Sequence, residues 1–236
     1  MTSSPRAGVV AIAAIAIGIG LSGCGSDTKS ESTTSKETTS AAAAATTTTS
    51  KAAPAPPPPD AAGPNKTIVD YIKENGIVET PVQRGDAGSP TIDLPFPPGW
   101  EDAGNRKPAW AYGAIVFSDP AMAQNPPTII ALVSKLAGNV DPAKILEYAP
   151  GEIRNLPGYE GATAGTPSTL SGFEATQIGG MYVKDGVKRA IAQKTVVIPG
   201  QDGLYVLQLN ADGTEDQMGP LMDATNAIDE QTKITT

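Results

Sequence analysis

The chain has 236 residues, with 17 Lys and Arg, 25 Asp and Glu and no His, so its formal net charge is −8. The lack of histidine excludes Ser-His-Asp and Cys-His catalysis and His-ligated zinc, and a single cysteine excludes an internal disulfide and a Cys-rich metal site. An acidic chain without a basic patch is also unsuited to binding the phosphate backbone of DNA or RNA. We therefore expect no nucleic acid partner.

Residues 1–23 are predicted to be a lipoprotein signal peptide. Arg6 supplies a positive charge, and residues 8–21 form an apolar run shorter than the ~20 residues that a membrane-spanning helix needs. The run ends in Leu21-Ser22-Gly23-Cys24, which resembles the bacterial lipobox. The resemblance implies cleavage before Cys24 and acylation of its thiol. We therefore expect Cys24 to anchor the chain at the outer face of the plasma membrane, in the periplasmic space.

Residues 24–64 are predicted to form the lipidated cysteine and a disordered tether. The stretch is rich in Ser, Thr, Ala and Pro and contains no Val, Ile, Leu or aromatic residue. Without apolar side chains to bury, it cannot offset the entropy that folding costs. A flexible coil of about 40 residues spans roughly 35 Å, which holds a following domain clear of the lipid head groups.

Residues 65–236 are predicted to form a single globular domain whose first half contains two helices. The first covers residues 66–75, where Asn65 or Thr67 can cap it and Gly76 can end it. The second begins at Asp141-Pro142, an N-cap followed by proline, and is expected to end at Pro150-Gly151. Extended segments are expected at residues 78–82, 91–94, 109–118 and 128–136, with a proline-rich loop over 95–100.

The second half of the predicted domain is mostly extended and ends in a helix. Asp185-Gly186 predicts a two-residue hairpin turn, whereas Asp202-Gly203 is expected inside a longer turn. The last helix is expected to start at Thr214, which is spaced from Gln217 as in a capping box. Extended segments are expected at residues 159–163, 173–183, 186–198 and 203–210.

The order of these elements predicts the fold class. Tyr205, Leu207 and Leu209 alternate with Leu204 and Val206, so apolar side chains point to both faces of the last strand. Both faces of the sheet should therefore be covered. We expect an α+β fold, a mostly antiparallel sheet flanked by helices.

No pattern in the sequence predicts catalysis. There is no G-x-S-x-G nucleophile elbow, and no lysine or carboxylate is placed by spacing to serve as a base. Asn210, Asp212, Thr214 and Asp216 alternate oxygen ligands, but glycine falls at the wrong place for a calcium loop. We therefore expect no catalytic residue, no metal site and no cofactor.

Large, adaptable side chains predict a site for an apolar ligand. Aromatic faces stack on sugar rings, and methionine fills irregular grooves. A groove that takes ten methylenes would gain about 8 kcal/mol before the costs of binding. The alternative is that these side chains only build the core. The candidate ligand-binding residues are Trp100, Trp110, Tyr112, Tyr148, Tyr159, Met181, Met218 and Met222. Tyr182 is a further large side chain of the same kind.

Further motifs are spread over nearly the whole of the predicted domain. They include Glu79-Thr80-Pro81-Val82, Asp141-Pro142-Ala143-Lys144, Ala149-Pro150-Gly151-Glu152, Asn155-Leu156-Pro157-Gly158, Gln193-Lys194-Thr195-Val196-Val197-Ile198-Pro199 and Leu207-Gln208-Leu209-Asn210-Ala211-Asp212. In these motifs the chain resembles the mycobacterial LpqN/LpqT lipoprotein family. The resemblance implies a PsbP-like α/β/α sandwich. It also implies a non-enzymatic envelope lipoprotein, with Cys24 as the one functional residue carried over.

These observations lead to one main function hypothesis and two alternatives. We expect a membrane-anchored, monomeric domain that binds a glycolipid or fatty-acyl ligand and partner envelope or secreted proteins, in support of cell-envelope biogenesis. The first alternative is a protein-only adaptor or host-interacting factor, which would show an apolar patch on the order of several hundred Å² and no pocket. The second is a hydrolase with two close carboxylates in a cleft.

Overall fold

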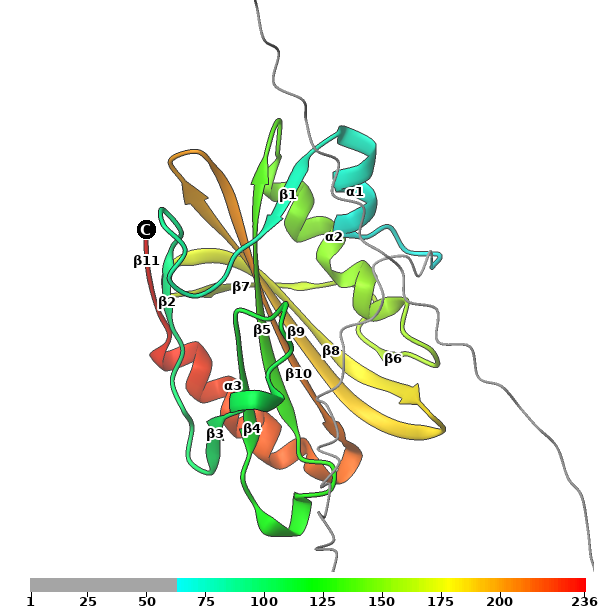
Figure 1. Cartoon of the computed structure of the whole chain (residues 1–236). Helices are drawn as coiled ribbons and strands as arrows, with labels where there is room; N and C mark the ends of the chain where they lie inside the picture. Colours follow the sequence, from blue (N-terminus) through cyan, green and yellow to red (C-terminus); the bar gives the residue numbers. More distant parts are fainter. Residues whose placement is uncertain (1–62) are drawn as a thin grey trace, which may run out of the picture. The chain divides into compact units, whose positions relative to one another are not determined.

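A twisted antiparallel sheet with helices on both faces dominates the structure (Figure 1). The structure is a computed structural model that describes residues 63–236. The predicted signal peptide, Cys24 and the predicted tether up to residue 62 lie outside the described residues. Among residues 63–236, no helix combines the length and the hydrophobicity needed to cross a bilayer.

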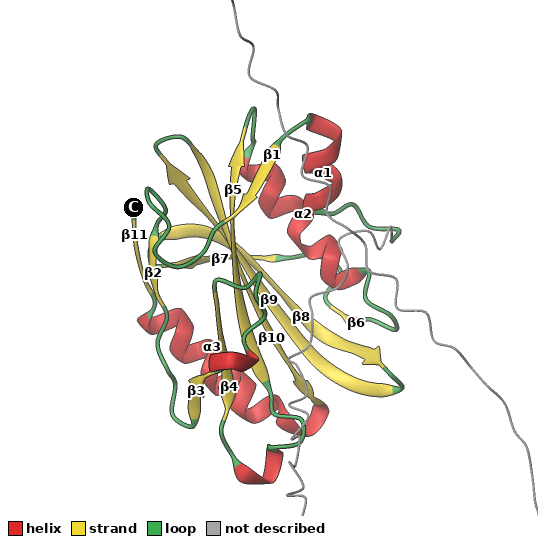
Figure 2. Cartoon of the chain, in the orientation of Figure 1, coloured by secondary structure: helices red, strands yellow, loops and turns green. Residues whose placement is uncertain are grey.

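Across residues 63–236, eleven strands make up one sheet of nine and one of two (Figure 2). Their bounds are β1 Val78–Pro81, β2 Thr91–Asp93, β3 Trp100–Asp102, β4 Gly113–Phe117, β5 Thr128–Ala137, β6 Glu160–Gly161, β7 Thr166–Leu170, β8 Phe173–Lys184, β9 Val187–Gly200, β10 Gly203–Thr214 and β11 Lys233–Thr235. The large sheet has the order β3-β4-β5-β10-β9-β8-β6, β1 also pairs with β5 and β7 with β8, and β2 pairs with β11. Every one of these pairs is antiparallel.

Three α-helices in the described part of the chain cover the sheet: α1 Ile68–Asn75, α2 Pro142–Arg154 and α3 Met218–Gln231. The α1 and α2 helices pack on one face with Val197, Leu204 and Val206, whereas α3 packs on the other with Leu207 and Leu209. The predicted division of apolar side chains between two covered faces is therefore confirmed, and with it the α+β class.

Local capping chemistry sets where two of the helices begin. The Thr67 hydroxyl accepts a hydrogen bond from the Asp70 N–H, and the Asp70 carboxylate accepts one from the Thr67 N–H. Thr67 rather than Asn65 is thus the cap of α1, and Gly76 ends that helix in the left-handed conformation, at φ 60°. Thr214 and Gln217 form the expected capping box, although a short 3₁₀ turn precedes α3.

The predicted end of α2 at Pro150-Gly151 is wrong, because the helix continues to Arg154. Proline in a helix interior removes one hydrogen bond and costs about 3 kcal/mol. Tertiary packing compensates: Ile153 is buried against β8 and β9. A Cβ atom on Gly151 would lie 2.0 Å from the carbonyl oxygen of Lys66. Glycine therefore lets α2 lie directly against the chain that enters α1.

The strand predictions were correct in the centre of the sheet and incomplete at its edges. Asp185 and Gly186 form the expected two-residue turn, both with positive φ. The turn between β9 and β10 is shorter than predicted, since Gly200 already pairs with Gly203. Three short strands, β3, β7 and β11, were not predicted from the sequence, and Trp100 of β3 falls in the expected proline-rich loop. These segments become strands only by pairing with β4, β8 and β2.

Three buried polar side chains connect the end of β8, the start of β9 and the end of β10. The Tyr182 hydroxyl donates to the Asp212 carboxylate at 2.5 Å, and the Arg189 guanidinium donates to the other carboxylate oxygen at 2.9 Å from Nε. Burial, together with the Asp212 carboxylate, raises the pKa of Tyr182 far above its ordinary value. The hydroxyl therefore stays protonated and keeps donating its hydrogen bond.

A second polar cluster lies between α2 and the sheet. The Glu152 carboxylate accepts hydrogen bonds from Gln208, at 3.0 Å, and from Gln193, at 3.3 Å. Burial raises the pKa of Glu152 above its ordinary value, the two amides oppose that shift, and the charge of Glu79 adds to it. Two neutral amides thus hold a desolvated carboxylate.

Replacing Glu152 with Gln is expected to raise the free energy of unfolding at neutral pH by about 1–2 kcal/mol. The folded state of the native chain holds the Glu152 proton to a higher pH than the unfolded state does. Stability therefore falls as the pH rises from the ordinary carboxyl range through the folded pKa. Urea unfolding at several pH values should show that the stability advantage of Glu152→Gln over the native chain shrinks toward zero below about pH 4. Glu147→Gln, on the exposed side of α2, is the control, and an equal gain there would contradict the explanation.

Candidate functional site

A groove lies between α3 and the sheet face formed by β8, β9 and β10. It consists of two adjoining cavities of about 300 Å³ and 270 Å³. Gly179, Ala192, Ala211 and Thr225 line both cavities, which makes them one continuous groove. Each volume is near the lower end of the range for ligand pockets, so the groove suits a slender ligand.

The floor of the groove is a row of small side chains. Gly179 pairs with Ala192, and Ala192 pairs with Ala211, so the three lie side by side across β8, β9 and β10. Ala190 continues the floor next to Met181. Larger side chains at these positions would fill the space under α3. The register of three strands therefore creates the groove.

One half of the groove is almost entirely apolar. Met181 on β8 and Leu221 on α3 line it, and Met218 and Met222 form its rim, where they are 41% and 58% exposed. Exposed methionine side chains are flexible and adapt to ligands of irregular shape. This half can therefore hold an aliphatic chain without a matching rigid pocket.

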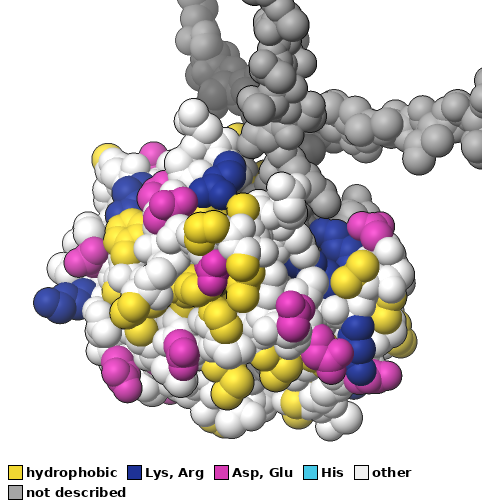
Figure 3. Space-filling model, turned by 90° about the horizontal axis from the view of Figure 1, so that it is seen from below, with side chains coloured by type: hydrophobic (Ala, Val, Ile, Leu, Met, Phe, Trp, Pro, Cys, Tyr) yellow, Lys and Arg dark blue, Asp and Glu magenta, His cyan; other side chains and the backbone are white. Residues whose placement is uncertain are grey.

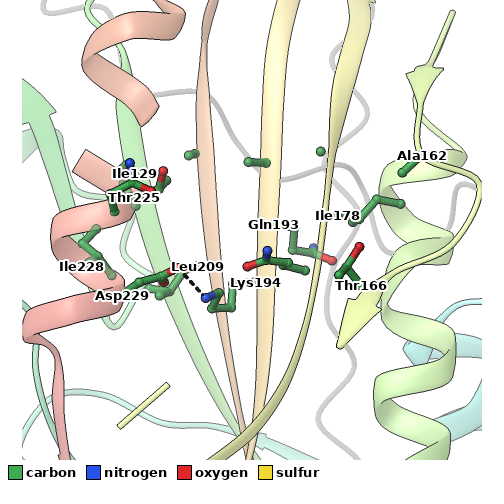
Figure 4. A pocket seen from close by; sticks show the side chains of 15 residues that line it. Ile129, Ala162, Thr166, Ile178, Gln193, Lys194, Leu209, Thr225, Ile228 and Asp229 are labelled. Atoms are coloured by element: carbon green, nitrogen blue, oxygen red, sulfur yellow. Dashed lines mark ion pairs between the residues drawn. The ribbon is translucent and has the colours of Figure 1, made fainter. Parts of the chain in front are cut away.

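The other half contains an ion pair among polar side chains (Figure 4). The Lys194 ammonium lies 2.6 Å from the Asp229 carboxylate and 3.1 Å from the Ser168 hydroxyl. Gln177 and Asn226 add amide groups at the edge. The Lys194 side chain is 9% exposed and that of Asp229 38%, so the pair is accessible from the carboxylate side. The groove as a whole is amphipathic along its length.

Three of the eight candidate ligand-binding residues come together in this groove: Met181, Met218 and Met222. The other five lie outside its lining, and their ligand-binding role remains a prediction. Trp100 packs against Phe117, Trp110 packs against a buried cluster that includes Ala111 and Val116, and Tyr148 packs against Tyr71. The Tyr112 hydroxyl accepts a hydrogen bond from the Ile92 N–H, and the Tyr159 hydroxyl lies 3.0 Å from the Gly179 carbonyl oxygen.

The small floor residues and the Lys194–Asp229 ion pair were not predicted from the sequence. A signal was present for some of them: Gly179-Gly180 interrupts a strand, where glycine often marks a close approach of a ligand or of another backbone. Lys194 likewise stands in a strand that is otherwise largely apolar. Ala192 and Ala211 carry no such signal, because alanine fits almost any buried position.

The groove offers little for hydrolysis or metal binding. Asp229 is the one carboxylate among the described residues that line it, whereas the hydrolase alternative requires two. Within residues 63–236, no three acidic or cysteine side chains are grouped as metal ligands would be. On the face shown in Figure 3, side chains of both charges are interspersed with hydrophobic ones.

Comparisons with known proteins agree on one family. The profile of the family described as probable lipoprotein LpqN matches residues 64–235. Lipoprotein LpqN of Mycobacterium tuberculosis is 56% identical over 227 residues, which cover 95% of this chain and 97% of that protein. A crystal structure described as LpqN involved in cell envelope biogenesis of Mycobacterium tuberculosis aligns with a TM-score of 0.70. That alignment covers 74% of this chain and 100% of the crystallised one.

Proposed function

Because this chain belongs to the LpqN lipoprotein family, we propose that it is a non-enzymatic envelope lipoprotein that holds an amphiphilic lipid in the groove under α3. In this role it would support cell-envelope biogenesis, the process in which the crystallised relative is involved. The ligand class is an acylated or glycosylated envelope lipid. The polypeptide acts as a carrier or presenter of that lipid rather than as a catalyst.

The amphipathic groove is the observation that carries this proposal. Met181, Met218, Leu221 and Met222 supply an apolar channel, where each buried methylene of an acyl chain would gain ~0.8 kcal/mol. The Lys194–Asp229 end supplies hydrogen-bonding groups for a polar head. A lipid would therefore lie along the groove, with its chain under the first turns of α3.

The membrane anchor is the second part of the proposal. Cys24 lies outside the described residues, and its flanks match the lipobox. Lipidation there would place the groove near the outer face of the plasma membrane, in the periplasmic space. Mass spectrometry of the N-terminal peptide should find a mass that corresponds to diacylglycerol on Cys24. An unmodified thiol at position 24 of the mature chain would contradict the anchor.

Partner envelope or secreted proteins belong to the same proposal. Met218 and Met222 stand exposed at the groove rim, where a partner could cover them while receiving the lipid. Crosslinking from the α3 side should recover a partner from envelope extracts, and the domain itself is proposed to be monomeric. A groove is the feature that a protein-only adaptor lacks, so the structure gives that alternative less support.

Native mass spectrometry tests the ligand directly. Residues 25–236, secreted by a mycobacterial host and purified without detergent, should carry a reproducible added mass that organic solvent extracts as a lipid. A bare polypeptide mass that stays unchanged after incubation with envelope glycolipids would contradict lipid binding. That result would favour the protein-only adaptor, and crosslinked partners would then define the function.

A further inference from the structure

We propose that Asp229 is a specificity-determining residue that makes the groove select lipids with an uncharged head group and reject anionic ones. It would do so by neutralising Lys194, the buried cation at the polar end of the groove. This inference rests on the proposed function, because it concerns which lipid the same groove accepts.

The position of Lys194 is one where folding alone favours an apolar residue. On the same face of β9, Val196 and Ile198 are completely buried, and the cross-strand partner Leu209 belongs to the same core cluster. Lys194 itself is 8% exposed. Buried ion pairs add little net stability compared with apolar side chains of similar size. The charge at this position therefore points to a role in binding.

The Lys194 ammonium has hydrogen-bonding capacity beyond its two partners in the protein. An ammonium group has three N–H donors, and the Asp229 carboxylate and the Ser168 hydroxyl take two of them. One donor is left for a ligand. The Asp229 carboxylate, with 38% of its side chain exposed, keeps free acceptor positions. Together the pair presents a donor beside an acceptor and no net charge.

An anionic head group would meet the Asp229 carboxylate at this point. To reach the Lys194 ammonium, a carboxylate or phosphate would have to lie within a few ångströms of a like charge, a repulsion that partial exposure of Asp229 to water weakens but does not remove. A hydroxylated, uncharged head can instead donate to Asp229 and accept from Lys194. Gln177 and Asn226 extend this environment, because each amide both donates and accepts.

Two probes with chains of equal length test the selectivity: dodecyl maltoside, which is uncharged, and dodecanoate, which is anionic. Calorimetry would use residues 25–236, which include every described residue, with both probes below their micellar concentrations. The native chain should bind dodecyl maltoside at least about tenfold more tightly than dodecanoate. Asp229→Asn should tighten dodecanoate binding by about tenfold or more, because it exposes the Lys194 charge while keeping a similar shape.

Two further variants separate this explanation from others. Adding Lys194→Met to Asp229→Asn should abolish the gain for dodecanoate, since the cation is then gone. Asp202→Asn removes the same charge from an exposed residue outside the groove and should leave both affinities unchanged. Thermal unfolding of each variant checks that it is folded. If Asp229→Asn does not fold, Asp229→Ser is used in its place.

The outcomes distinguish this proposal from the proposed function. If the native chain binds both probes equally, or prefers dodecanoate, or if Asp229→Asn gives no gain, the charge selectivity is wrong while lipid binding stands. If the native chain binds neither probe, the lipid-binding function is itself contradicted, and the selectivity falls with it. Tenfold selectivity that depends on Asp229 would support both.

Discussion

Replacing Ala192 with Phe is expected to weaken binding of dodecyl maltoside about 100-fold. Ala192 lies in the middle of the floor, between Gly179 and Ala211, and lines both cavities. A phenyl ring there would displace three or four methylenes of the alkyl chain. At ~0.8 kcal/mol each, this loss amounts to about 3 kcal/mol, or roughly two orders of magnitude in Kd. Isothermal titration calorimetry measures it directly.

The matched control is the same substitution on the opposite side of the molecule. Ala143 is exposed on α2, so Ala143→Phe should leave the Kd unchanged. Thermal unfolding should show that Ala192→Phe is folded, because the ring enters space that is empty in the native chain. Native affinity in a folded Ala192→Phe variant would mean that the ligand does not occupy this groove.

Replacing Asp212 with Ala is expected to lower the free energy of unfolding by about 3–5 kcal/mol. Asp212 accepts hydrogen bonds from Tyr182 and Arg189, and all three residues are buried. Its removal leaves the Arg189 guanidinium buried without a counter-charge and the Tyr182 hydroxyl without its acceptor. Both groups would then pay the cost of desolvation without compensation. Urea unfolding followed by circular dichroism gives the size of the loss.

Asp202→Ala is the control for this prediction. Asp202 forms an ion pair with Lys135 at 3.4 Å, but its side chain is 81% exposed. Exposed pairs contribute about 0–1 kcal/mol, so its removal should change stability little. If the two alanine variants were equally stable, the buried cluster would not hold β8, β9 and β10 together as proposed.

Local sequence signals predicted the fold where they agree with the tertiary contacts. The capping pairs Thr67–Asp70 and Thr214–Gln217 act within four residues, so the cap of α1 and the cap of the 3₁₀ turn before α3 were predictable, although α3 itself starts at Met218. The end of α2 was not, because the contact of Ile153 with β8 and β9 offsets the usual effect of proline. That contact joins segments far apart in the sequence, and no local pattern contains it.

Side-chain chemistry alone identified part of the candidate site. Methionine was singled out for its flexibility, and Met181, Met218 and Met222 do line the groove. The same reasoning also selected Trp100 and Tyr112, which lie in the core. Size and chemistry are the same for a core residue and a ligand-binding one, so only their surroundings separate them.

The sequence by itself provided the resemblance to a lipobox at Cys24, the family resemblance and the α+β class, because each depends on residues close together or on a pattern along the chain. Only the tertiary structure decided where the groove lies and which charges face it. The row Gly179–Ala192–Ala211 exists because two strand registers align those positions. The Lys194–Asp229 pair exists because α3 packs across β9. Strand register and helix packing depend on the energy of the whole core, and no short stretch of sequence records them.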